Sequence, residues 1–85
     1  MATPTWKPVP EGGWIVQTRE YTVAIWPEAD GWRASCSRDR TAWQGGRRGS
    51  PREALLDLWR SLRHDTLGDE YMREKVKEIG PPQEK

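Results

Sequence analysis

The sequence is short of cysteine and histidine, with one of each, and of long apolar runs. One cysteine cannot form an intrachain disulfide, so Cys36 favours a reducing compartment and we expect a cytoplasmic protein. Cys36 and His64 together are too few for a four-ligand structural zinc site, and we expect no metal and no cofactor. No apolar stretch is long enough to span a membrane, and residues 1–10 lack the apolar segment of a secretory signal.

Phenylalanine is absent, and leucine, isoleucine and valine together number only 12 of 85 residues. So few aliphatic side chains would indicate disorder if charge of one sign were in excess, but the formal net charge is +1. Six tryptophans compensate, because each can bury about 150–250 Å² of surface. The length suits one small domain, and we expect a tryptophan-rich core.

Sequence signatures of catalysis are also missing. The glycines at 45, 46 and 49 lack the lysine and the spacing of a phosphate-binding loop. A Cys36–His64 nucleophile pair is an alternative, but a buried strand cysteine and a histidine near a helix end explain both residues more simply. The acidic residues near apolar segments have no evident partner; they are Asp30, Asp39, Glu53 and Asp57. We expect no enzymatic activity.

Alternation of apolar and polar residues predicts an antiparallel sheet. Residues 14–18, 20–26 and 32–37 have the pattern of strands, and residues 41–44 are a candidate for a fourth. The Asp30-Gly31 pair predicts a hairpin between the second and third strands. Trp26 and Arg33 then fall on one face of the sheet, and the apolar positions fall on the other: Tyr21, Val23, Ile25, Trp32, Ala34 and Cys36.

The strongest local signal begins a helix at residue 51. Ser50 is a typical N-cap, Pro51 suits the first helical position, and Glu53 completes a capping box. This helix should end near residue 64 and turn one apolar stripe toward the sheet, formed by Ala54, Leu55, Leu58, Trp59 and Leu62. A second, shorter helix is predicted over residues 69–79, followed by prolines 81 and 82.

These elements predict an α+β fold: an antiparallel sheet of three strands, or four, packed on one main helix, with a short C-terminal second helix. We expect residues 1–13 to be a flexible N-terminal arm, residues 14–80 a single domain and residues 81–85 a frayed tail. Trp6 is unusual in a free arm, and it either docks on the domain or contacts a partner. The pattern leaves open whether the last helix covers the second face of the sheet.

Charge is unevenly distributed along the chain. Residues 33–52 contain six arginines and one acidic residue, whereas both flanking segments carry more acidic than basic residues. Arginine binds carboxylates and phosphates through two parallel hydrogen bonds and stacks on aromatic rings. The candidate binding residues are therefore these arginines and the tryptophans near them: Trp26, Arg33, Arg38, Arg40, Trp43, Arg47 and Arg48. The alternative is a solvated loop in a chain whose composition is rich in arginine and tryptophan.

The segment from Tyr21 to Leu62, about half of the chain, resembles HicB-like antitoxin domains. The similar stretches are Y-T-V-A-I-W-P-E-A-D-G-W-R-A-S, which begins at Tyr21, and S-P-R-E-A-L-L-D-L, which begins at Ser50. The resemblance implies strand, acidic glycine hairpin, strand and capped helix, in a domain that sequesters a protein partner, typically a toxin nuclease. Residues 37–46 depart from the family, because they are arginine-rich where it has a proline-rich segment with Gly-Cys.

Two functions follow from these observations. The first is a small non-enzymatic binding protein, antitoxin-like or a phage-type inhibitor, that grips a protein partner through tryptophan and arginine. The alternative is a nucleic-acid-binding domain that uses the open sheet face and residues 33–52. The strand order also resembles the three-stranded DNA-binding domains of phage-type integrase arms and plant ethylene-response factors. A homodimer, in which exposed tryptophans join copies, is a further option.

Overall fold

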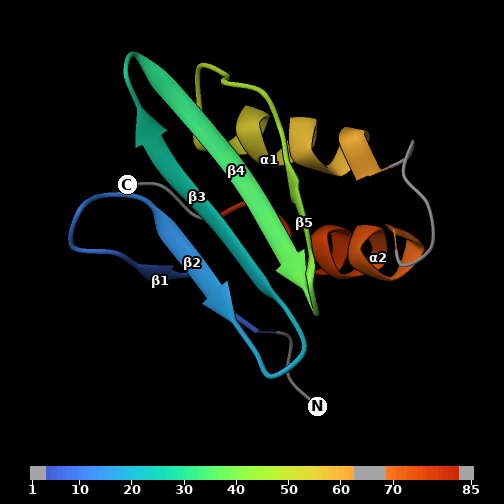
Figure 1. Cartoon of the computed structure of the whole chain (residues 1–85). Helices are drawn as coiled ribbons and strands as arrows, with labels where there is room; N and C mark the ends of the chain where they lie inside the picture. The colour runs from blue at the N-terminus through green and yellow to red at the C-terminus, as the bar shows by residue number, and fades with distance from the viewer. Residues whose placement is uncertain (1–3, 63–68, 83–85) are drawn as a thin grey trace.

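The computed structural model describes residues 4–62 and 69–82. Within these residues, an antiparallel sheet of five strands packs against two helices (Figure 1). The strands lie side by side in chain order, and the elements are β1 (Lys7–Pro8), β2 (Trp14–Gln17), β3 (Thr22–Glu28), β4 (Gly31–Arg38), β5 (Thr41–Gln44), α1 (Pro51–Ser61) and α2 (Asp69–Ile79).

The fold is α+β, but the predicted count of three or four strands is wrong. β5 is the candidate fourth strand, and the additional one is β1, which lies within the segment predicted as a flexible arm. In β1, Lys7 pairs with Ile15 and Pro8 pairs with Trp14. Two residues that include a proline carry no alternation, so sequence periodicity could not reveal this strand.

A glycine pair makes β1 possible, because it turns the chain back onto β2. Gly12 and Gly13 have φ angles of 106° and 93°, in the region that favours glycine. The Val9 N–H donates to the Gly13 carbonyl at 3.1 Å, and the Gly12 N–H donates to the Val9 carbonyl at 2.8 Å. A Cβ atom on Gly13 would overlap the Ile25 carbonyl oxygen, so the turn also lies tightly against β3.

Trp6 docks on the domain, at the C-terminal end of α2. Its indole Nε1 donates to the Gly80 carbonyl at 2.8 Å, and its ring packs against the core. Gly80 has a φ of 71° and its N–H donates to the Val76 carbonyl at 3.1 Å, which is how α2 ends. The segment before β1 is thus tied to the segment after α2.

We expect Trp6→Phe to lower the free energy of unfolding by about 0.5–1.5 kcal/mol, because an aromatic ring is retained while the bond to Gly80 is lost. Denaturant unfolding would measure the change. Trp26→Phe is the matched control, because the Trp26 ring does not belong to the aromatic side chains that pack against the core. An equal loss of stability in both variants would contradict this role of the indole N–H.

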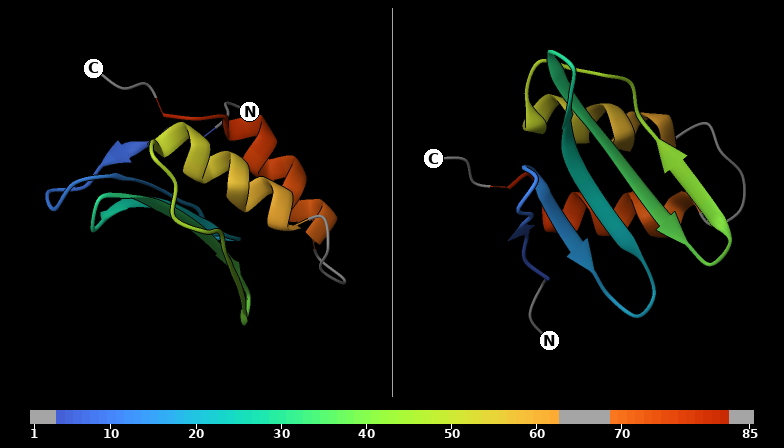
Figure 2. Two further views of the ribbon diagram at one scale, coloured as in Figure 1. Left: turned by 90° about the horizontal axis from the view of Figure 1, so that it is seen from above. Right: turned by 60° about the vertical axis from the view of Figure 1, so that its left-hand side comes forward.

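Both helices cover the same face of the sheet, as Figure 2 shows. The apolar stripe predicted for α1 is confirmed. Trp59 is partly buried, and the other four residues of the stripe are buried. The predicted capping box is confirmed as well, since the Ser50 hydroxyl accepts the Glu53 N–H at 3.1 Å. The buried core combines three sets of side chains: Val16, Tyr21, Val23, Ile25, Ala34 and Cys36 from the sheet side, Ala54, Leu55, Leu58 and Leu62 from the α1 side, and Met72 and Val76 from α2.

Candidate binding surfaces

The strand register decides on which face of the sheet each candidate residue lies. Residues directly opposite each other in antiparallel strands point to the same side. Trp26 pairs with Arg33, and neither belongs to the helix-facing row that contains Val23 and Ile25. Trp43 pairs with Cys36, which is buried beneath the helices. The predicted site residues are therefore divided between two faces.

The face that neither helix covers is called the open face here. Trp26 and Arg33 lie on it, together with other side chains of the same register rows: Ile15, Thr22, Ala24, Ser35, Ser37 and Gln44. The other five tryptophans pack against the core, whereas Trp26 does not. Trp26 is thus a partly buried aromatic ring on the face that lies away from the apolar core.

Arg33 is held in a fixed position beside Trp26. Its Nε donates to Glu28 Oε1 at 2.7 Å, and its Nη1 donates to the Gly45 carbonyl at 3.0 Å. The Arg33 side chain is 27 % exposed. Because its rotamers are already restricted, Arg33 would lose little conformational entropy on contacting a ligand.

Arg38 and Trp43 are used inside the fold. Arg38 lies on the helix side of β4, with its guanidinium 4.0 Å from the centre of the Tyr71 ring of α2. The Tyr71 hydroxyl donates to Glu20 Oε1 at 3.1 Å, so these three residues join α2 to the sheet. Trp43 packs against the core. Neither Arg38 nor Trp43 can share a contact surface with Trp26.

The other three candidates flank β5. Arg40 is exposed in the turn before it, and Arg47 is exposed in the loop after it. Arg48 pairs with Trp32 through two backbone hydrogen bonds of 2.7 and 2.8 Å, and its Nη2 donates to Asp57 Oδ1 at 2.6 Å. The loop predicted over residues 45–49 is thus fixed against β4 and α1.

Asp57 of α1 holds this loop in place. Its Oδ2 accepts the Gly46 N–H at 2.5 Å while its Oδ1 binds Arg48. Burial acts to raise the pKa of Asp57, but the hydrogen bonds from Gly46 and Arg48 and the arginine charge outweigh it, and the pKa is lowered. Gly45 lies so close to α1 that a Cβ atom would come within 2.9 Å of the Leu58 nitrogen. Asp57 therefore has a structural role.

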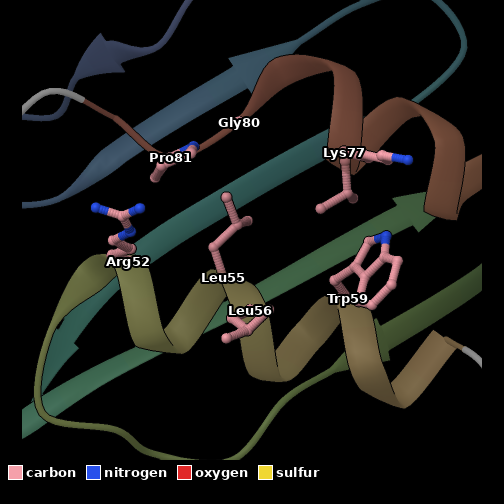
Figure 3. Close-up of a pocket in the computed structure, with 8 residues that line it drawn as sticks. Arg52, Leu55, Leu56, Trp59, Lys77, Gly80 and Pro81 are labelled. Atoms are coloured by element: carbon pink, nitrogen blue, oxygen red, sulfur yellow. The ribbon is translucent and has the colours of Figure 1, made fainter.

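A groove between α1 and α2 is the feature that sequence analysis missed (Figure 3). Its volume is about 180 Å³ and its lining is mainly apolar: Arg52, Leu55, Leu56, Trp59, Val76, Lys77, Gly80 and Pro81. Leu56 is 44 % exposed in it. The available signal was Leu56 itself, because it stands outside the apolar stripe of its own helix. Arg52 and Lys77 lie toward opposite ends of the groove.

Comparison of the chain with protein-family models, with curated proteins and with solved structures gives no match. In residues 4–62 and 69–82, no group of three or more histidine, cysteine or acidic side chains is arranged to hold a metal ion. Neither of the two helices in this part of the chain is long and apolar enough to cross a membrane.

Proposed function

We propose that this chain is a small non-enzymatic binding protein that holds a protein partner on its open face, with Trp26 as the anchor. One observation carries the proposal: Trp26 lies on a helix-free sheet face and does not pack against the core. Tryptophan and arginine dominate the binding energy of protein interfaces, and here Arg33 stands directly opposite Trp26.

The charges of the open face support a protein partner over nucleic acid. Binding to a phosphate backbone depends on cations that are available to replace counterions. Of the candidate arginines, Arg33 is paired with Glu28 and Arg48 with Asp57, while Arg40 and Arg47, which flank β5, form no ion pair within the described residues. Arg38 is stacked on Tyr71 on the opposite face. A mixed surface with one aromatic anchor is more typical of the centre of a protein interface.

The resemblance to HicB-like antitoxin domains supports a more specific version of the proposal. In that version the partner is a toxin-like nuclease that the chain sequesters, and the complex forms in the cytoplasm.

We expect Trp26→Ala to weaken binding of the partner by about 30-fold or more, which corresponds to the loss of one hot-spot side chain of about 2 kcal/mol. Affinity capture on the immobilised protein would identify the partner, and titration calorimetry would compare dissociation constants. Leu56→Ala is the matched control, because it removes an exposed apolar side chain from the α1–α2 groove and leaves the open face intact. Equal affinity of Trp26→Ala and the unmodified protein would reject the open face as the binding site.

Fluorescence anisotropy with labelled single- and double-stranded DNA and RNA, at two salt concentrations, distinguishes the alternative function. Under the proposal, no nucleic acid binds tightly at low salt. Tight binding that is lost as the salt concentration rises would instead establish a nucleic-acid-binding domain. Replacing Arg40 or Arg47 with glutamine should then make the affinity depend less steeply on salt concentration.

A further inference from the structure

The sheet has two edges, β1 and β5, at opposite ends of the strand order (Figure 1). An edge strand presents backbone N–H and C=O groups that no neighbouring strand satisfies, and another chain can pair with them. In this sheet, such pairing is blocked at β1 and is not blocked at β5.

At β5, Ala42 and Gln44 direct their backbone groups outward. The Gly45 N–H donates to the Ala34 carbonyl at 3.0 Å, and the register pairs Trp43 with Cys36. Since bonding direction alternates along a strand, residues 41, 43 and 45 bond to β4 and residues 42 and 44 point away from it. Ala42 and Gln44 are both exposed.

At β1, the outward position is occupied by Pro8. Lys7 pairs with Ile15 and the Val9 N–H donates to Gly13, so residues 7 and 9 face β2 and residue 8 faces outward. Proline has no N–H, and it is a common means of blocking an edge. The residues of β5, T-A-W-Q, include neither proline nor a charged side chain, so this second edge is unprotected.

The charges on either side of β5 indicate what would pair with it. Arg40 precedes the strand and Arg47 follows it; both are exposed, and neither forms an ion pair within the described residues. Arg48, paired with Asp57, is still 51 % exposed. The one nearby acidic side chain in the turn is Asp39. Two copies joined antiparallel through β5 would bring these arginines together, whereas an acidic strand would be attracted to both ends.

We propose that the β5 edge binds an extended acidic peptide segment as a sixth strand of the sheet. Its backbone pairs with Ala42 and Gln44, and its carboxylates lie near Arg40 and Arg47. Four strand residues span about 13 Å, at a rise of about 3.3 Å per residue, so the contact involves a short segment. The proposal goes beyond the binding function assigned to the open face, because it does not use Trp26.

Ala42→Pro tests the proposal, because it removes one outward N–H and leaves the hydrogen bonds from residues 41, 43 and 45 to β4 in place. The probe is a labelled heptapeptide of alternating glutamate and valine, followed by fluorescence anisotropy. We expect the unmodified protein to bind it, Ala42→Pro to bind at least tenfold more weakly, and Ala42→Val, which keeps the N–H, to bind within twofold of the unmodified protein. A lysine–valine heptapeptide should not bind.

Hydrogen exchange by NMR provides a readout that does not depend on the folding of the proline variant. The amides of Ala42 and Gln44 should exchange rapidly in the protein alone and become protected when the acidic peptide is added. Arg40→Gln with Arg47→Gln should weaken peptide binding and flatten its salt dependence. Absence of peptide binding by the unmodified protein would overturn the proposal. So would a β5-mediated dimer in sedimentation that Ala42→Pro abolishes, because the edge would then belong to a second copy.

Discussion

Leu58→Ala should lower the free energy of unfolding by about 2–5 kcal/mol, the largest loss we expect from any single truncation considered for this chain. Leu58 is 0 % exposed and belongs to the row of α1 that faces the sheet. Within residues 4–62 and 69–82 the core cluster contains 12 buried side chains, so little neighbouring material can move into the cavity that the substitution creates. The loss therefore includes a cavity contribution in addition to the reduced burial of apolar surface.

Leu56→Ala is the matched control, because it makes the same chemical change two residues earlier on the same helix. Leu56 is 44 % exposed and lines the α1–α2 groove, so we expect it to cost less than about 1 kcal/mol. Urea unfolding of both variants, followed by tryptophan fluorescence, would give the comparison. Similar losses for the two variants would mean that the core does not lie between α1 and the sheet.

The second large effect is expected at Asp57. Asp57→Asn should lower the free energy of unfolding by about 1–3 kcal/mol at neutral pH, because it removes the charged acceptor of two hydrogen bonds. The Asp57 side chain is only 18 % exposed, which limits compensation by water. The expected structural consequence is loosening of the loop from Gly45 to Gly49, which includes Arg47.

The contribution of Asp57 should also depend on pH. Its pKa in the folded protein is lowered from the ordinary 3.8, so the stabilisation is complete above that value and is lost as pH falls through the folded-state pKa. Unfolding measured between pH 7 and pH 2 should show the unmodified protein and Asp57→Asn converging at the acid end. Asp30→Asn, at an exposed turn position, is the control and should change the free energy of unfolding at neutral pH by no more than about 0.5 kcal/mol. Parallel curves for Asp57→Asn would contradict a lowered pKa.

Local patterns were sufficient for the central part of the fold. The capping box at Ser50 and the apolar spacing of α1 depend only on near neighbours in the chain, as does the alternation in β3 and β4. β1 could not be predicted in this way, because its two residues become a strand only when Gly12 and Gly13 fold them back and Trp6 is bound by Gly80. The Trp6 contact requires a tertiary structure that already exists, and two strand residues next to a glycine turn leave no periodic pattern in the sequence.

The candidate binding surface could be predicted only in part, because the face on which a residue lies depends on the register of the strands beyond each turn. Alternation on both sides of the turn, which the structure forms at Ala29 and Asp30, placed Trp26 and Arg33 on the same face, and their register confirms that placement. Trp43 lies beyond a second turn, at Asp39, and a shift of one residue there moves every following side chain to the other face. Arg38 follows Ala34 and Cys36 at alternate positions of β4, so it lies on the helix side, where its guanidinium stacks on the Tyr71 ring of α2. The charge pattern of the sequence could not predict this cation–π contact.

The contact between Trp6 and Gly80 has a consequence for how the protein is made. Translation delivers the N-terminal residues first, yet the carbonyl that accepts the Trp6 indole N–H lies 74 positions later in the chain. The hairpins of the sheet need only near neighbours and can form while synthesis continues. Trp6, however, cannot form its hydrogen bond to Gly80 until α2 has left the ribosome. A chain halted before Gly80 would therefore lack the carbonyl that accepts the Trp6 indole N–H.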